Sequence, residues 1–195
     1  MRSVSALAQF WREFLASPGR TGAIAPSSPA LGRRMVEWID WPQAGTVIEC
    51  GPGTGAFTGE ILRRLRPAAA FLAVELNPRF VEELRRQFPD AEIAEGSVQE
   101  LPTLAARAGL GPADAVLSSL PWAAFPPPLQ RECLGAIRAA LRPGGQFVTF
   151  AYNIGRWTAK GRRFRDLLPH YFATVEESST AWLNLPPAFV YRCRR

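Results

Sequence analysis

A glycine-rich turn between two apolar runs constrains the fold of this chain more than any other feature. Residues 47–55 read VIECGPGTG, and residues 71–76 read FLAVEL, with Glu75 near the end of the second run. A helical pattern separates the runs, which is the order of a strand, a helix and a second, parallel strand. Glycines let the backbone approach a ligand, and a helix N-terminus offers unpaired N–H groups. Because Glu75 follows the turn at about the spacing at which an acid reaches a ribose diol, the sequence predicts a nucleoside-cofactor site.

The composition is that of one globular domain with a basic charge balance. The chain has 195 residues, 47% hydrophobic and 21% charged, with a formal net charge of +6, and Lys160 is its only lysine. Arginine suits phosphate recognition through its planar fork, and an arginine-rich genome would give the same excess. Cys50, Cys133 and Cys193 follow neither a metal-ligand nor a disulfide spacing. We therefore expect no metal and a reducing cytoplasm.

Residues 1–20 are expected to form an N-terminal amphipathic helix. Apolar residues at helical spacing fill residues 4–16, and they include Phe10, Trp11 and Phe14. The commoner fate of such a stripe is packing on the domain's own core, and the alternative is the headgroup layer of a bilayer, where it would bind membrane. The sequence alone does not choose. No apolar run is long enough to span a membrane, and charged residues interrupt the first run, so we expect no secretory signal.

Residues 21–195 alternate strand and helix patterns, which predicts a doubly wound, Rossmann-like α/β domain. The end of the chain departs from this alternation and reads as an antiparallel hairpin. A nicotinamide dehydrogenase normally continues its parallel series instead. Strands are expected at 47–50, 71–75, 92–94, 113–118, 146–152, 173–183 and 188–193, and helices at 29–40, 54–66, 78–88 and 128–141.

The glycine turn by itself does not identify the cofactor. Gly51, Gly53 and Ala56 also satisfy the dinucleotide fingerprint, so NAD stays open at this point. Three further features favour another cofactor. An acid, Glu49, precedes the first glycine, a long segment precedes the motif, and the fourth strand ends in SSLPW at residues 118–122.

These residues resemble the motifs of class I S-adenosylmethionine (SAM) methyltransferases. The four motifs are ExGxGxG from Glu49, VELNP from Val74, EGS from Glu95 and SLPW from Ser119. SLPW is similar to the loop of amino-group methylases, including the rRNA adenine dimethylases. The fuller resemblance is to bacterial phospholipid N-methyltransferases, which share GAIAPSS at 22–28 and NLPPAFVYR at 184–192. It covers nearly the whole chain, and the two flanking segments are its specific part.

The resemblance implies SAM as cofactor and S-adenosylhomocysteine as product. Glu49 would anchor the amino group of the cofactor, Glu75 would bind the ribose hydroxyls, and Leu76 would pack against adenine. Ser97 stands where the family usually has an acid that accepts from the adenine amino group. Its hydroxyl or the Val98 backbone would replace that acid, and Ser97 also suits a plain turn. The implied cofactor residues are Glu49, Gly51, Gly53, Thr54, Gly55, Glu75, Leu76, Gly96, Ser97, Val98 and Ser118.

Methyl transfer requires a neutral amine held in line with an already activated methyl group, and such positioning contributes roughly 7–11 kcal/mol. Ser119 and the Leu120 carbonyl are expected to accept hydrogen bonds from the amine. The Trp122 face would either stabilise the growing charge, by roughly 0.5–2 kcal/mol, or only anchor the loop. Tyr152 is a candidate for proton removal, with solvent as the alternative. His170 is expected to be structural.

Residues 155–165 read GRWTAKGRRFR, with five cations and no acid. Such runs are usually solvated faces, but this one follows a strand at the ligand-binding edge of the expected sheet. Trp157, Lys160, Arg162 and Arg163 are therefore candidates for binding a phospholipid headgroup or an anionic membrane surface. The same cluster would suit RNA.

Three classes of function compete, and the sequence favours the first. It is a cytoplasmic enzyme, peripheral on the inner face of the membrane, that methylates a lipid amine, most simply phosphatidylethanolamine towards phosphatidylcholine. The second is an RNA adenine N6-methyltransferase, weakened by Ser119 where the rRNA dimethylases carry asparagine and by the lack of their additional C-terminal domain. The third is a non-catalytic SAM-binding or membrane-binding protein. We expect no nucleic acid and no obligate protein partner.

Overall fold

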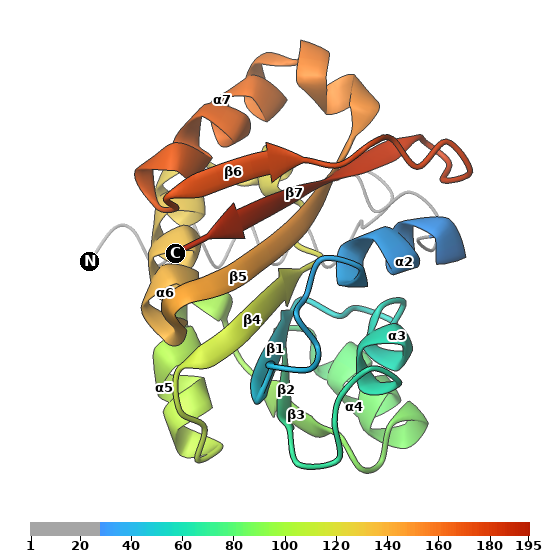
Figure 1. Ribbon diagram of the computed structural model, residues 1–195, viewed down its shortest axis with the longest axis vertical. Helices are drawn as coiled ribbons and strands as arrows, with labels where there is room; N and C mark the ends of the chain where they lie inside the picture. The colour runs from blue at the N-terminus through green and yellow to red at the C-terminus, as the bar shows by residue number, and fades with distance from the viewer. Residues whose placement is uncertain (1–27) are drawn as a thin grey trace.

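The centre of the protein is a seven-stranded sheet, seen in a computed structural model that describes residues 28–195 (Figure 1). The strand order is β3-β2-β1-β4-β5-β7-β6. β1 to β5 are parallel, whereas β7 runs antiparallel to both β5 and β6. The strands are β1 Thr46–Cys50, β2 Ala70–Glu75, β3 Glu92–Glu95, β4 Ala113–Ser118, β5 Leu141–Tyr152, β6 Thr174–Glu177 and β7 Ala188–Arg194. The predicted Rossmann-like α/β fold with a C-terminal antiparallel hairpin is confirmed.

Helices cover both faces of this sheet (Figure 1). One apolar core lies between the sheet and α5, α6 and α7, and the other lies between the sheet and α2, α3 and α4. The α-helices are α2 Pro29–Val36, α3 Thr58–Leu62, α4 Pro78–Gln87, α5 Leu101–Arg107, α6 Pro127–Ala140 and α7 Ala159–Leu167. Short 3-10 turns are η2 Val98–Glu100, η3 Trp122–Ala124, η4 Asn153–Trp157 and η5 Leu168–His170.

Two helices begin where the sequence places an N-cap and a proline. The Ser28 side chain accepts from the Leu31 N–H at 3.2 Å, and Pro29 opens α2. The Asn77 side chain accepts from the Arg79 N–H at 3.0 Å at the start of α4. A capping oxygen satisfies an N–H that the helix leaves unpaired, so these starts are set by local sequence.

The parallel register brings the chemically important residues to one edge. Cys50 at the end of β1 pairs with Val74 on one side and with Ser118 on the other. Glu75 at the end of β2 lies beside Glu95 at the end of β3. The carboxyl ends of β2, β1 and β4 therefore meet, which is where parallel α/β sheets bind ligands.

Several boundaries differ from those expected. The helix predicted from Thr54 begins at Thr58, because Gly55 donates to the Pro52 carbonyl at 2.9 Å and closes a turn. α5 and α7 were not predicted, although α5 carries buried apolar residues at helical spacing. β6 stops at Glu177, since the Ser178 hydroxyl accepts from the Val190 N–H and ends the regular ladder. The predicted N-terminal helix lies outside the described residues.

All three cysteines are buried and unbridged. Within residues 28–195, no cluster of three or more potential metal ligands occurs. In the same range, no helix has the length and apolarity needed to cross a bilayer.

Candidate active site

The glycine turn joins β1 to α3, and its first two glycines have different tasks. The Gly51 N–H donates to the Val74 carbonyl at 2.8 Å, and a Cβ on Gly51 would lie 2.7 Å from the Leu120 side chain. Gly53 has a φ of +57°, and no heavy atom lies within 4 Å of where its Cβ would be. Gly51 thus allows the SLPW loop at residues 119–122, which we call the acceptor loop, to pack on the turn. Gly53 leaves open space for a ligand. Thr54 beside it is exposed.

Gly55 packs closely against the segment that ends α4. Its φ is +83°, and a Cβ there would lie 2.8 Å from the Phe88 ring and 3.1 Å from the Leu84 side chain. Leu84 lies in the last turn of α4, and Phe88 is the C-cap that follows it. These surroundings give Gly55 a role in holding the turn against α4, and the cofactor contact that the resemblance implied for it stays a prediction.

Glu75 is a buried carboxylate that organises the turn. Its Oε2 accepts from the Gly53 N–H at 3.0 Å, and its Oε1 accepts from the N–H groups of Leu76 and Asn77 at 2.8 and 2.9 Å. Burial raises the pKa of Glu75, and these three N–H donors oppose that rise. A carboxylate has about four acceptor sites, so a diol that replaces or joins these donors finds an acceptor already in place.

Glu49 lies one strand away and is completely buried. Its Oε2 accepts from the Thr58 hydroxyl at 2.7 Å, while its Oε1 is buried with no hydrogen-bond partner. Burial, first, and the charge of Glu75 raise the pKa of Glu49 to about 8. Buried polar atoms are normally paired, so this oxygen fits a site for a cationic group.

The third predicted motif follows β3 and is largely occupied by local contacts. The Gly96 N–H donates to the Glu75 carbonyl at 2.9 Å. The Ser97 hydroxyl caps η2 by accepting from the Gln99 N–H at 3.3 Å, and it donates to the Gln99 Oε1 at 3.1 Å. The Val98 side chain is part of the core. Ser97 therefore acts as the turn residue that the sequence allowed, and adenine contacts by Ser97 or the Val98 backbone stay predictions.

The SLPW loop is held against the sheet by a chain of buried hydrogen bonds. The Ser119 N–H donates to the Cys50 carbonyl at 3.0 Å. The Thr149 hydroxyl donates to the Ser118 carbonyl at 2.9 Å and accepts from the Trp122 indole at 3.1 Å. The Gln130 amide donates to the Trp122 carbonyl at 2.7 Å. Ser119 is left half-exposed at the sheet edge, beside the glycine turn.

Ser118 and Leu120 are also used inside the loop. The buried Ser118 hydroxyl accepts from the Leu120 N–H at 3.3 Å. The Leu120 carbonyl accepts from the Trp122 N–H at 2.9 Å, and one lone pair remains for an amine. The predicted cofactor contact of Ser118 would have to come from its backbone, or from its hydroxyl while that hydroxyl also accepts from the Leu120 N–H.

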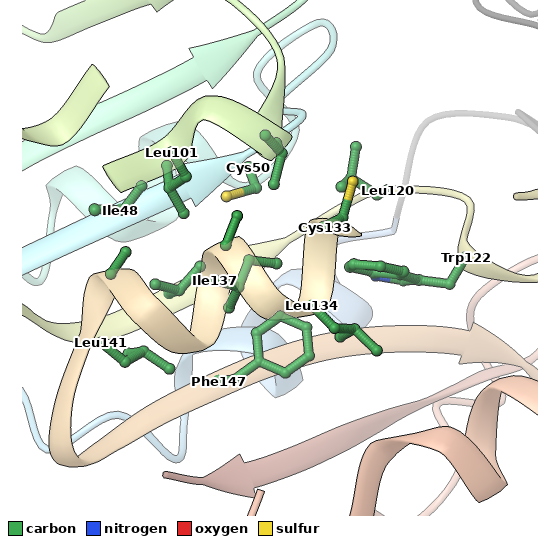
Figure 2. Close-up of a cluster of buried hydrophobic side chains, with 14 of the residues drawn as sticks. Ile48, Cys50, Leu101, Leu120, Trp122, Cys133, Leu134, Ile137, Leu141 and Phe147 are labelled. Carbon is green, nitrogen blue, oxygen red and sulfur yellow. The ribbon is translucent and has the colours of Figure 1, made fainter. Parts of the chain in front are cut away.

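The Trp122 ring anchors the loop, and its surroundings do not favour the predicted role beside a growing positive charge. The ring is 2% exposed and stacks on Phe164 of α7, with centroids 5.1 Å apart and an interplanar angle of 14°. Phe147 and Phe125 pack edge-on or tilted against it. Figure 2 shows it beside Leu134 and Phe147 in the buried cluster. The surface of the ring is therefore used for packing. This favours loop anchoring, the second of the two roles that the sequence left open for Trp122.

Tyr152 ends β5 and is half-buried beside Phe150, 5.7 Å between centroids. Burial raises its pKa above the usual value of 10. A phenol with a raised pKa keeps its proton at neutral pH, so Tyr152 is a poor general base. Proton loss to solvent is the alternative that this placement favours.

The basic run covers the end of η4 and most of α7. The Thr158 hydroxyl caps this helix by accepting from the Gly161 N–H at 3.1 Å. Lys160, Arg162 and Arg163 are exposed on it, and Trp157 just before it is 81% exposed. The predicted headgroup or membrane residues are therefore on the surface and close together in sequence, which is compatible with the prediction and does not test it.

The chain matches a methyltransferase family and several proteins named as methyltransferases. Residues 47–145, more than half of the chain, match the family described as "Methyltransferase domain". A relative from Singulisphaera acidiphila, named ornithine lipid N-methyltransferase, is 34% identical over 175 residues, which is 88% of this chain and 87% of the relative. The chain belongs to the SAM-dependent methyltransferases. A second relative, a probable ribosomal RNA small subunit methyltransferase A of Methanospirillum hungatei, is 37% identical over 101 residues, only 52% of this chain and 38% of that protein.

Solved structures agree on the methyltransferase fold. The O-methyltransferase of Bacillus cereus in complex with S-adenosylhomocysteine (SAH) has a TM-score of 0.71 at 14% identity, covering 96% of this chain and 91% of that one. The N-methyltransferase NodS of Bradyrhizobium japonicum has a TM-score of 0.63 at 14% identity, covering 96% and 97%. SAM is the cofactor of this methyltransferase.

The site of the methyltransferase fits that cofactor on observations of its own. Gly53 leaves room, Glu75 offers acceptors for a diol, and the buried Glu49 Oε1 has no hydrogen-bond partner. Sequence reasoning missed Thr58, which fixes Glu49, and Thr149, which fixes the acceptor loop. A polar residue inside the apolar run QFVTF was a usable signal for Thr149, whereas nothing local marks Thr58.

Proposed function

We propose that this methyltransferase transfers the methyl group of SAM to the amine of a membrane lipid. Phosphatidylethanolamine is the first substrate to test, and an ornithine lipid is the second because the relative from Singulisphaera is named for it. The supporting observation is that this relatedness covers both flanks of the catalytic domain. Ser28, the last residue of the first flanking segment, donates its N–H to the Oδ1 of Asn184, the first residue of the second, at 2.9 Å.

Bound SAM supplies a sulfonium methyl group, and the protein's part is positioning. Glu75 and Glu49 fix the cofactor at its ribose and amino ends. The half-exposed Ser119 and the Leu120 carbonyl accept from the amine, which aims its lone pair along the transfer axis. The lone pair of the neutral amine would form the new N–C bond as the bond between the methyl carbon and the sulfur of SAM breaks, with SAH as the leaving group. The resulting ammonium gives its proton to solvent, because the described residues offer no suitable base there.

The experiment is a transfer assay with methyl-labelled SAM and four acceptors. These are vesicles containing phosphatidylethanolamine, vesicles containing an ornithine lipid, vesicles of phosphatidylglycerol alone and purified ribosomal RNA. Label in either amine-containing vesicle and in neither other acceptor is the expected result. Label in RNA alone would replace this proposal with RNA methylation, for which the partial match to the rRNA methyltransferase is the present support.

A further inference from the structure

An exposed apolar surface lies where the sheet's carboxyl edge meets the C-terminal hairpin. In the part of the chain that the structure describes, five large apolar side chains are highly exposed. They are Ile154 at 69%, Trp157 at 81%, Trp182 at 74%, Leu183 at 85% and Leu185 at 82%. They occupy two segments, η4 and the loop between β6 and β7. Isolated exposed apolar residues are ordinary, but their confinement to two adjoining segments indicates a binding surface.

The loop between β6 and β7 is built to hold its leucines outward. Asn184 between them is 4% exposed. Its Oδ1 accepts from the Ser28 N–H at 2.9 Å, and its Nδ2 donates to the Pro186 carbonyl at 2.7 Å. The polar residue is thus buried and fixed, while Leu183 and Leu185 on either side face solvent. Usually the apolar residues of a loop are buried and the polar residue is exposed, and here the reverse holds. The hydrogen bonds of Asn184 offset the cost of burying its amide and keep the loop in this conformation.

The two segments form one surface. The Asn153 N–H at the start of η4 donates to the Pro187 carbonyl at 2.8 Å, and its side chain bonds to the Thr180 hydroxyl at 3.2 Å. On the other side of η4, the Arg162 side chain donates to the Trp157 carbonyl at 2.7 Å. The apolar side chains are therefore joined directly to the cationic start of α7.

This surface also adjoins the catalytic edge. Tyr152 at the carboxyl end of β5 pairs with Ala188 at the start of β7, so the loop before Ala188 lies at the same edge as Glu75 and Ser118. Figure 1 shows the loop projecting beyond the ends of β5 and β7. Phe164 of α7 stacks on Trp122 of the acceptor loop, which ties the cationic helix to the site.

We propose that Trp182, Leu183 and Leu185, with Ile154 and Trp157, insert into the interfacial layer of an anionic phospholipid bilayer. Tryptophan prefers that layer, since its ring is apolar and its N–H seeks water. Lys160, Arg162 and Arg163 supply the complementary charge. The role in presenting substrate rests on the proposed function, but the binding itself does not.

The test compares two triple variants of the loop. Trp182→Ser/Leu183→Ser/Leu185→Ser removes the apolar surface, and Trp182→Phe/Leu183→Met/Leu185→Met retains it. Co-sedimentation with vesicles of phosphatidylglycerol and phosphatidylethanolamine should be roughly 100-fold weaker for the serine variant and unchanged for the matched control. SAH binding by calorimetry should be the same in both, because none of the three side chains enters the cofactor site.

If the serine variant bound vesicles as tightly as the wild-type protein does, the proposal would be overturned. A wild-type dimer that the serine variant converts to a monomer, with vesicle binding unchanged, would reassign the surface to a second copy of this chain. If the serine variant does not fold, the tryptophan fluorescence of the wild type and of Trp182→Phe can be compared in vesicles that contain brominated lipid. The lipid should quench the fluorescence of the wild type more than that of Trp182→Phe. Equal quenching of the two proteins would refute insertion.

Failure of the proposed function gives a different result. In that case no lipid amine is methylated, yet vesicle binding still depends on the loop. If both proposals hold, the serine variant loses methylation of bilayer lipid and keeps methylation of a short-chain phosphatidylethanolamine dispersed below its micelle concentration.

Discussion

Two buried carboxylates at the cofactor edge have different environments. Glu75 accepts from three backbone N–H groups, whereas Glu49 accepts from one hydroxyl and has one oxygen without a partner. The pKa of both is raised by burial, and that of Glu49 reaches about 8. Glu75 is therefore prepared as an acceptor, and Glu49 gains most from a cationic ligand.

Replacement of Glu75 by alanine should weaken SAH binding at least about 100-fold, because it removes charged acceptors worth roughly 1.5–3 kcal/mol each. It also frees the Gly53 N–H, which loosens the turn. Calorimetric titration measures the effect. The matched control is Glu95→Ala, since Glu95 lies opposite Glu75 in the sheet but is exposed. Equal affinity of the Glu75 variant and the wild type would contradict the ribose assignment.

Cofactor binding should depend on pH through Glu49. Because its pKa is about 8, the free carboxyl is mostly protonated at neutral pH, while an ammonium partner favours the ionised form. SAH affinity should therefore fall about tenfold for each pH unit below 8. Calorimetry from pH 6 to 9 checks this. The SAH affinity of the Glu49→Gln variant should be nearly independent of pH. A pH dependence that survives in Glu49→Gln would assign it to another group.

The same shift has a consequence for stability. The folded pKa of Glu49 lies above its usual 4.5, so between these values the folded state holds a proton that the unfolded chain has lost. The free energy of unfolding should then decrease as pH rises from about 4.5 to 8. Glu49→Gln should reduce that decrease, as measured by urea unfolding at pH 5 and pH 8.

At the scale of elements, α7 depends on one close contact. A Cβ on Gly161 would lie 2.0 Å from the Gly155 carbonyl oxygen, so only glycine lets α7 pack on η4. This contact supports both Trp157 and, through Phe164, the acceptor loop. A helix with four cations is therefore positioned by packing, not by its charge.

Gly161→Ala should cost roughly 1–3 kcal/mol of unfolding free energy, because α7 or η4 must move. Gly155→Ala is the control, since no atom lies within 4 Å of its Cβ position, and its effect should stay within about 0.5 kcal/mol. Urea denaturation measures both. If the two variants were equally stable, α7 would not need this contact.

For the whole molecule, the question is where the basic charge acts. The net charge of +6 is ambiguous in sequence, and the structure places Lys160, Arg162 and Arg163 beside the exposed apolar surface. Three other exposed arginines lie in the last turns of helices whose ends are at the opposite edge of the sheet, and they are Arg86 of α4, Arg107 of α5 and Arg138 of α6. A charge of equal size is thus available as a control.

Lys160→Gln/Arg162→Gln/Arg163→Gln should weaken binding to phosphatidylglycerol vesicles roughly 100-fold at low salt, at about 1 kcal/mol per charge. The difference should shrink as salt is raised. Arg86→Gln/Arg107→Gln/Arg138→Gln changes net charge equally at the opposite edge and should have little effect. Co-sedimentation over a salt series measures both. Equal losses in the two variants would mean that total charge, not this surface, attracts the membrane.

The sequence alone determined the order of the strands along the chain, the glycine turn and the acid at the end of β2, whereas α5 and α7 were missed. These follow from periodicity and spacing within short segments, which act through local geometry. It also marked the two flanking segments, without indicating that Ser28 and Asn184 are hydrogen-bonded. Helix boundaries failed where turns intervened, as at Gly55.

Tertiary structure decided the tasks of individual side chains. Glu49 has Thr58 as its partner, Trp122 is covered by Phe164, and the leucines beside Asn184 face solvent. Each of these facts depends on which distant segments meet and what they exclude from water, and no local pattern encodes that. The kind of site could therefore be predicted from the sequence. The role of each residue in it is set only when the sheet brings these residues to one edge.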